Sequence, residues 1–114
     1  MKVLILDDDP HIVNCFSELL SDSHEVFSTS SPFEAVNILK GTVIDLIITD
    51  YNMPELCGLE LANIAIDNYN TDVIIITGDI DFNTVNEKIT VLRKPIMFST
   101  LIKHVLNIEE KRLK

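Results

Sequence analysis

The chain has 114 residues, the length of a single domain, and 46% of them are apolar, which is enough for a packed core without a disulfide or a structural metal. Nine basic residues against 18 acidic residues give a net charge of −9, which argues against nucleic acid or an anionic membrane as a direct partner. No apolar run reaches the length of a membrane span, and the first residues do not have the pattern of a signal peptide.

The cysteines and histidines show no metal-binding pattern. Cys15 and Cys57 lack metal-ligand spacing and are typical of small apolar residues in a reducing compartment, so we expect a cytoplasmic protein. His11, His24 and His104 have no second ligand at metal spacing and are expected at the surface.

Short apolar runs alternate with helical stripes along the whole chain. Strands are predicted at 3–6, 26–27, 46–49, 73–76 and 90–93. Helices are predicted at 10–20, 32–40, 58–68 and 98–106, with a weaker helical stripe at 81–89. This alternation predicts an α/β fold with a doubly wound, five-stranded parallel sheet in the order 2-1-3-4-5, which is the flavodoxin-like arrangement.

Polar residues follow four of the predicted strands, at the point where each strand ends: Asp7 and Asp8, then Asp50, then Thr77 with Gly78, and finally Lys94. The carboxyl ends of parallel strands meet at one edge of the sheet, where ligands bind in open α/β folds. The first and third strands are neighbours in the predicted order, so three carboxylates would crowd one pocket. Two like charges about 4 Å apart repel by about 4 kcal/mol at a surface-like dielectric, and a hard divalent cation such as Mg²⁺ offsets that repulsion.

The same groups form a receptor for a phosphoryl group. A cation and Lys94 would neutralise the phosphoryl oxygens while the exposed carboxylate of Asp50 attacks phosphorus and forms an acyl phosphate. Thr77 and the backbone N–H of Gly78 are expected to donate hydrogen bonds to the same oxygens. Each feature alone has an ordinary interpretation, as a helix cap, a turn or a surface lysine, and only their order along the strands makes the pattern specific.

In these features the chain resembles the receiver domain of response regulators in two-component signalling. The resemblance covers almost the whole length and rests on residues 3–10, 50–54 with 58–60, 76–78 and 94–95. It implies that Asp50 accepts a phosphoryl group from the phosphohistidine of a histidine kinase or phosphotransfer protein. Asp8 and Asp50 would bind Mg²⁺ directly. Asp7 would act through water, and Asn52 would contribute its backbone carbonyl.

The resemblance also implies roles for the remaining strand-end residues and for partners. Lys94 would pair with a phosphoryl oxygen, Thr77 would hydrogen-bond to one after phosphorylation, and the Lys94–Pro95 peptide bond would be cis. The protein would be a signalling module that assists only its own phosphorylation and dephosphorylation, not an enzyme. Besides the phosphodonor, its partners would be a downstream target protein or an output domain, and a homodimer is a further possibility.

Two features depart from the family pattern. Many receivers have an aromatic residue three positions before the lysine, where this chain has Val91, whose short and stiff side chain cannot swing as a ring does. Only 16 residues lie between Thr77 and Lys94, so the usual fourth helix is expected to be shortened, irregular or missing. We therefore expect the protein to signal through an altered surface, by ordering residues 78–90.

Two other interpretations stay open. The segment Asp7-x-Asp9 resembles the nucleophile motif of haloacid-dehalogenase-type phosphatases, and residues 78–81 weakly resemble the later acidic motif of that family. The order argues against this interpretation, because Lys94 follows the later motif, whereas the lysine of that family precedes it. A receiver-like binding module that no longer uses phosphorylation is the second alternative. For the domain itself we expect residues 1–108, with 109–114 as a charged C-terminal tail or the start of a linker.

Overall fold

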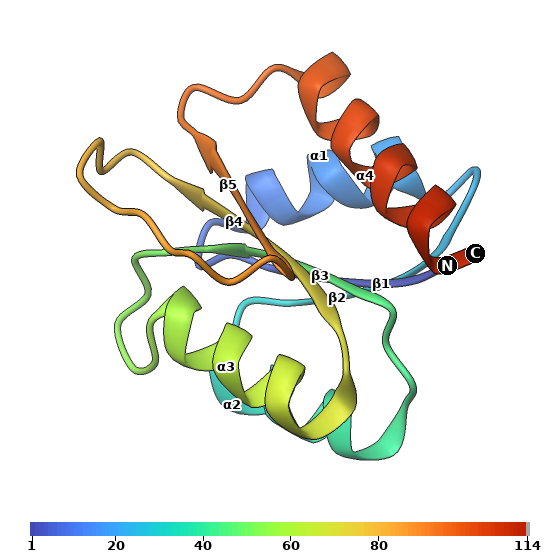
Figure 1. The fold of residues 1–114 in the computed structure, drawn as a ribbon, viewed down its shortest axis with the longest axis horizontal. Coiled ribbons are helices and arrows are strands. Elements are labelled where there is room, and N and C mark those ends of the chain that lie inside the picture. Colours follow the sequence, from blue (N-terminus) through green and yellow to red (C-terminus); the bar gives the residue numbers. More distant parts are fainter. Residues whose placement is uncertain (114) are drawn as a thin grey trace.

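The computed structural model describes residues 1–113 and contains one five-stranded parallel sheet with helices on both sides (Figure 1). The elements are β1 (Lys2–Leu6), α1 (Pro10–Leu20), β2 (Glu25–Thr29), α2 (Pro32–Gly41), β3 (Leu46–Asp50), α3 (Gly58–Tyr69), β4 (Asp72–Thr77), β5 (Ile89–Arg93) and α4 (Phe98–Leu113). The strand order is β2-β1-β3-β4-β5 and every neighbouring pair is parallel, which confirms the predicted topology. Within residues 1–113, none of the helices combines the length and the apolar character that crossing a membrane requires.

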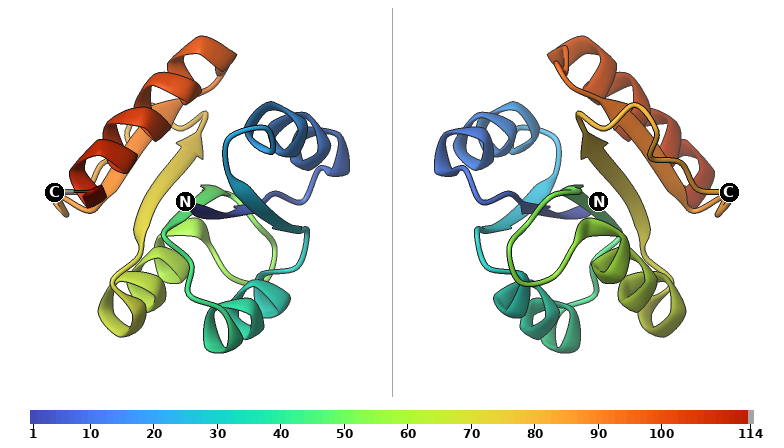
Figure 2. Two further views of the ribbon diagram at one scale, coloured as in Figure 1. Left: turned by 90° about the vertical axis from the view of Figure 1, so that its right-hand side faces the viewer. Right: turned by 90° about the vertical axis from the view of Figure 1, so that its left-hand side faces the viewer.

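The sheet is covered on both faces because successive side chains of each strand point to opposite sides. α1 and α4 cover one face, and α2 and α3 cover the other (Figure 2). Ile5 and Leu101 belong to the core under α1 and α4, whereas Leu4 and Leu61 belong to the core under α2 and α3, and all four are fully buried. With both faces taken up by apolar packing, the polar residues gather at the edge where the strands end.

The register of the sheet brings the strand-end acids together. Leu6 of β1 is paired with Thr49 of β3, so Asp7 and Asp50 follow at the same level of the sheet. From β1 the chain goes to β2 on one side and later to β3 on the other, which makes the β1/β3 boundary the topological switch point. Open α/β sheets bind their ligands at this point.

The connection between β4 and β5 contains no helix over residues 78–88, so the helix predicted at 81–89 is wrong and the family's fourth helix is missing (Figure 1). Side chains satisfy the backbone amides of this loop locally. Asp79 accepts a hydrogen bond from the amide of Asp81 at 2.9 Å, and three further bonds of this kind follow before β5. Such local bonds compete with helical hydrogen bonds, which explains why the weak apolar stripe does not form a helix.

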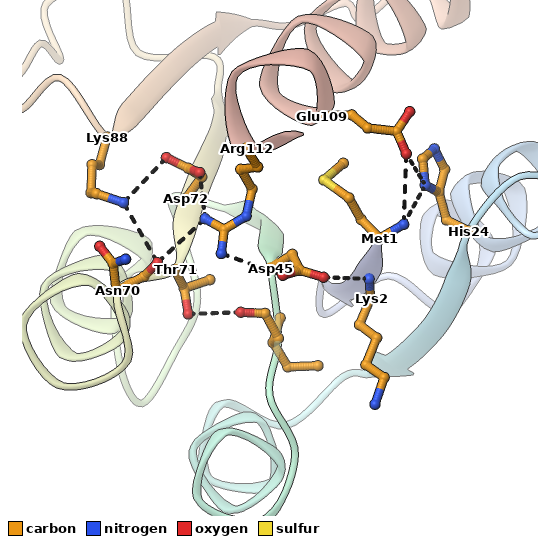
Figure 3. Close-up of polar contacts among 11 residues, drawn as sticks. Met1, Lys2, His24, Asp45, Asn70, Thr71, Asp72, Lys88, Glu109 and Arg112 are labelled. Atoms are coloured by element: carbon orange, nitrogen blue, oxygen red, sulfur yellow. Dashed lines mark hydrogen bonds and ion pairs between the residues drawn. The ribbon is translucent and has the colours of Figure 1, made fainter. Parts of the chain in front are cut away.

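The last helix continues to the end of the described chain, well past the start of the predicted charged tail. Arg112 donates a hydrogen bond to Asp72 at 2.7 Å, and its other terminal nitrogen lies 3.3 Å from Asp45 (Figure 3). These contacts tie the final turn of α4 to the start of β4 and to the residue before β3. Residues 109–113 are the last turns of α4, while Lys114 lies outside the described residues.

His24 is not the surface residue that the sequence predicts, because its side chain is only 4% exposed. Its Nδ1 atom lies 3.7 Å from a carboxylate oxygen of Glu109 in α4 (Figure 3). Burial, with the nearby terminal ammonium of Met1, lowers the pKa of His24 from 6.5, and the negative charge of Glu109 opposes this effect. His11 is exposed, as predicted.

Candidate functional site

A cavity of about 670 Å³ opens at the carboxyl edge of the sheet, beside the switch point between β1 and β3. We call it the strand-end cavity. Asp7, Asp8, Asp50 and Lys94 form its polar side, and apolar residues of α1 and of the segment leading into α4 form the opposite side. The cavity therefore contains four of the residues predicted from the strand ends.

Three carboxylates meet on the polar side of this cavity. One oxygen from each of Asp7, Asp8 and Asp50 lies within 4.8 Å of the other two. Asp7 and Asp50 are buried, with 7% and 5% of their surface exposed, whereas Asp8 is exposed. The description of Asp50 as an exposed carboxylate is thus wrong, and its side chain is reached through the cavity.

The environment of Asp7 shows how strongly charge is concentrated here. Burial raises the pKa of Asp7 from 3.8 to about 6. A hydrogen bond of 2.9 Å from the amide of Asp9 and the positive charge of Lys94 act in the opposite direction, and the negative charge of Asp50 adds to the rise. The cluster holds negative charge that water does not fully screen, which favours a cation as an additional partner.

Lys94 supplies one positive charge, because its Nζ atom lies 3.0 Å from Oδ1 of Asp50. This ion pair lacks hydrogen-bond geometry, and the buried Oδ1 atom has no hydrogen-bond partner among residues 1–113. A buried carboxylate oxygen without hydrogen bonds is costly unless positive charge offsets it, and here the single ammonium of Lys94 faces a cluster of three carboxylates. Clustered carboxylate oxygens suit Mg²⁺, so the donor set fits the metal that the resemblance implies.

Three other predicted site residues lie outside the lining of the cavity. Thr77 ends β4 and is fully buried, and its Oγ1 atom accepts a hydrogen bond from the amide of Asp79 at 3.0 Å. Gly78 and Asn52 are exposed in the loops after β4 and β3. The structure therefore brings together the three acids and Lys94, with these three residues around them.

The position of Lys94 follows from the pairing of β5 with β4. The amide of Lys94 donates to the carbonyl oxygen of Thr77 at 2.8 Å, which extends the strand pairing by one residue. The Lys94–Pro95 peptide bond is cis, as the resemblance implies. The lysine thus leaves the sheet directly beside the cavity.

Gly58 begins α3 in close contact with the chain at Asp50. A Cβ atom at this position would lie 2.6 Å from the backbone oxygen of Asp50 and 3.0 Å from the Cα atom of Tyr51. Backbone atoms cannot give way as the end of a flexible side chain does, so the position requires glycine. In the sequence Gly58 is only part of a family motif, and the structure supplies the physical reason for it.

The apolar side of the cavity was missed by the sequence patterns. Ile12 and Phe98 line it and are 37% and 51% exposed, and Phe98 packs edge-on against Phe16 with ring centroids 6.3 Å apart. In the sequence these residues belong to helical stripes, which predict core packing. Only the placement of α1 beside α4 shows that the stripes continue from the core into the cavity wall.

Comparison with known proteins agrees with this geometry. The family model described as the response regulator receiver domain matches residues 3–106. The chain belongs to this family. Receiver domains of response regulators are signalling modules, and the cavity of this receiver lies where its strand-end acids converge.

Curated relatives of this receiver are longer proteins. The transcriptional regulatory protein NatR of Bacillus subtilis is 37% identical over 82 residues, which are 68% of this chain and 35% of that protein. The cell cycle transcriptional regulator CtrA of Caulobacter vibrioides is 29% identical over 86 residues, or 74% of this chain and 37% of that protein. The chain thus matches these relatives over about a third of their length.

Solved structures of receivers confirm the fold. A response regulator receiver domain protein from Clostridium thermocellum has a TM-score of 0.85 and 33% identity, with 98% of this chain and 97% of that chain covered. The chemotaxis protein CheY4 of Vibrio cholerae has a TM-score of 0.80 and 27% identity, with 94% and 97% covered.

Proposed function

We propose that this receiver domain is a phosphoacceptor of two-component signalling and that Asp50 takes the phosphoryl group. The observation that carries the proposal is the buried Oδ1 atom of Asp50, which lies 3.0 Å from the Lys94 ammonium and has no hydrogen-bond partner among the described residues. Asp50 also lines the cavity, so a phosphoryl group that enters the cavity can reach this carboxylate, which would act as the nucleophile.

In the proposed reaction a carboxylate oxygen of Asp50 attacks the phosphorus of a phosphohistidine. The new O–P bond replaces the N–P bond, and the imidazole leaves and takes up a proton at the released nitrogen. Lys94 is near enough to pair with a phosphoryl oxygen and offset the negative charge on the transferred group. Hydrolysis of the resulting acyl phosphate releases inorganic phosphate and restores the carboxylate.

Asp7, Asp8 and Asp50 are the residues that would hold Mg²⁺, with the backbone carbonyl of Asn52 as the further ligand suggested by the family. When bound, the metal supplies positive charge to the carboxylates and to the phosphoryl oxygens. Asp7 must lose its proton to contribute, and a pKa of about 6 leaves it mainly ionised at neutral pH.

Exposed apolar side chains beside the cavity support a protein as the phosphodonor. Ile12 and Phe98 flank the opening and are partly accessible, so a helix of a histidine kinase or phosphotransfer protein could pack on them while its phosphohistidine reaches Asp50. Downstream, the proposed partner is a target protein or an output domain. Partial coverage of longer relatives is compatible with either arrangement.

Intact mass after incubation with acetyl phosphate and Mg²⁺ tests the proposal. We expect the wild type to gain one phosphoryl group only when Mg²⁺ is present, and Asp50→Asn to gain none. Asp67→Asn is the matched control, because this aspartate is exposed near the far end of α3, and it should be phosphorylated like the wild type.

The possible negative results separate the alternatives. If Mg²⁺ raises the thermal stability but the mass does not change, a histidine kinase replaces acetyl phosphate as the donor in the same assay. A chain that neither donor can phosphorylate contradicts the proposal and favours the phosphorylation-independent binding module. Turnover of a generic phosphate ester that depends on Asp7 and not on Asp50 would favour the phosphatase.

A further inference from the structure

The loop between β4 and β5 has a single buried side chain, Phe82, which is 8% exposed. Its ring packs on the ring of Tyr51, with centroids 4.2 Å apart and an angle of 32° between the planes. Tyr51 follows Asp50 directly, and its amide donates to the carbonyl oxygen of Ile76 at 2.9 Å. The one buried side chain of this loop therefore packs on the residue that follows the proposed phosphoacceptor.

Two more hydrogen bonds hold residues 79 and 82 of the loop. Their partners are a predicted site residue and the neighbour of another. The Oγ1 atom of Thr77 accepts a hydrogen bond of 3.0 Å from the amide of Asp79. The guanidinium of Arg93, the residue before Lys94, donates to the carbonyl oxygen of Phe82. Segment 78–82 is thus attached through Thr77 itself, through the residue after Asp50 and through the residue before Lys94.

Beyond these attachments the loop is held weakly. Ile80 is 83% exposed and Val85 is fully exposed, so neither contributes to the core. The side-chain oxygens of Asp79, Asn83, Thr84 and Asn86 accept hydrogen bonds from amides of the loop itself. Lys88, at the end of the loop, does reach outside it, with its Nζ atom 3.5 Å from the carbonyl oxygen of Asn70 and 3.7 Å from a carboxylate oxygen of Asp72. Segments with few buried contacts open at a small free-energy cost, so a modest change at the attachments is enough to alter this loop.

From this arrangement we propose that the β4–β5 loop is the surface that responds to phosphorylation, and that the stacked rings of Tyr51 and Phe82 transmit the change. The inference rests on the proposed phosphorylation of Asp50. A phosphoryl group adds nearly two negative charges and three acceptor oxygens beside Lys94 and Thr77. When the hydroxyl of Thr77 turns to donate to one of these oxygens, the amide of Asp79 loses its acceptor, while displacement of Tyr51 shifts the ring on which Phe82 rests.

If Phe82 had only a structural role, its replacement would have a different effect from the one that coupling through the ring pair predicts. In that case the ring only fills the space of the missing helix, and a smaller apolar residue would lower stability without changing how the loop responds to phosphorylation. Phe82→Leu separates the two roles, because leucine keeps an apolar side chain in the core but cannot stack on Tyr51. Phe33→Leu is the matched control, because Phe33 lies on α2 and is 60% exposed.

The experiment measures hydrogen exchange of residues 79–88 before and after phosphorylation, with the intact mass of the same sample recorded. In the wild type we expect exchange to become at least threefold faster on phosphorylation, because loss of the Thr77–Asp79 hydrogen bond releases the loop. This direction is opposite to the ordering of residues 78–90 that the sequence led us to expect. In Phe82→Leu the mass gain should persist, while the change over residues 83–88 should fall below half of its wild-type size. Tyr51→Leu should have the same effect from the other side of the contact, and Phe33→Leu should behave like the wild type.

Three results would overturn the inference, and they can be told apart. A phosphorylated wild type whose loop exchanges at an unchanged or slower rate excludes the loop as a segment released by phosphorylation. A full response in both Phe82→Leu and Tyr51→Leu excludes the ring pair as the coupling contact. Failure of the wild type to gain mass with any donor removes the proposed function itself, and with it the basis of the inference.

Discussion

The Nζ atom of Lys94 lies 3.0 Å from the Oδ1 atom of Asp50, although Asp50 ends β3 and Lys94 follows β5, and these strands are not neighbours in the sheet. β4 lies between these strands, and the carbonyl oxygen of its last residue, Thr77, accepts a hydrogen bond from the amide of Lys94. The lysine is therefore positioned over the end of β4 by backbone pairing. This places a positive charge on the acid proposed to take the phosphoryl group.

Replacing Lys94 by alanine should slow phosphorylation of Asp50 by about tenfold or more, because the charge that offsets the developing negative charge is removed. The rate of mass gain with acetyl phosphate at a fixed Mg²⁺ concentration measures the effect. Lys103→Ala removes an exposed lysine on α4 and should leave the rate unchanged. Equal rates in the two variants would show that Lys94 does not act on the transferred group.

Without Mg²⁺, Asp7 should make the protein less stable as the pH rises. The folded state holds the Asp7 proton up to about pH 6, whereas the ordinary pKa is 3.8, so the folded form binds more protons between these values and loses stability as the pH increases through them. Asp7→Asn should therefore be more stable than the wild type at pH 8, by on the order of 2 kcal/mol, and equally stable near pH 4. Urea unfolding at the two pH values measures this difference, and Asp22→Asn in the exposed turn after α1 should not show it.

Mg²⁺ should reverse this pH dependence. The metal binds the ionised carboxylates, so its affinity should fall as the pH drops below about 6 and Asp7 takes up its proton. Titration calorimetry at pH 7.5 and pH 5 would detect the loss. An affinity that is the same at both pH values would mean that Asp7 does not contribute to metal binding.

Gly58→Ala should destabilise the protein by about 1–3 kcal/mol and slow its phosphorylation, because the new methyl group meets the backbone at Asp50 and must displace it. Gly41→Ala provides a close comparison. A Cβ atom at Gly41 meets nothing within 4 Å, so this change at the end of α2 should be neutral or stabilise by about 0.5–1 kcal/mol. Similar unfolding curves for the two variants would contradict the close approach of α3 to Asp50.

Arg112→Ala should lower the free energy of unfolding by on the order of 1 kcal/mol, since it removes the partly buried contacts with Asp72 and Asp45. The amides of the last turn of α4 should also exchange faster. Lys111→Ala changes the exposed neighbour and should stay within about 0.5 kcal/mol of the wild type. If both variants unfold alike, the last turn of α4 is not held by Arg112.

Much of the fold follows from local patterns in the sequence. Short apolar runs bounded by polar or turn residues, such as 46–48, are typical of central strands, and the stripes between them form helices that cover both faces. Their alternation indicates parallel strands, and the carboxyl ends of parallel strands share one edge. The convergence of Asp7, Asp8, Asp50 and Lys94 was therefore predictable from order along the chain.

The structure differs from these predictions where other interactions compete with the local apolar pattern. These interactions are hydrogen bonds from side chains to nearby amides and contacts with distant parts of the chain. The stripe at 81–89 is outweighed by side chains such as that of Asp79, which bond to nearby amides in a loop. The charged residues at 109–113 extend α4, and Arg112 in its last turn forms ion pairs with Asp45 and Asp72 from distant parts of the chain.

The sequence by itself determined the parallel sheet and the chemical groups at its edge, because apolar periodicity and the alternation of strands and helices depend on neighbouring residues. The strand order was an expectation that the structure confirms. Only the tertiary structure decided that Asp50 is buried, that the cavity continues onto Phe98 and that Tyr51 stacks on Phe82. Burial and side-chain contact depend on which segments meet across the sheet. Burial and contact are therefore set by the packing of helices and loops that lie far apart in the chain.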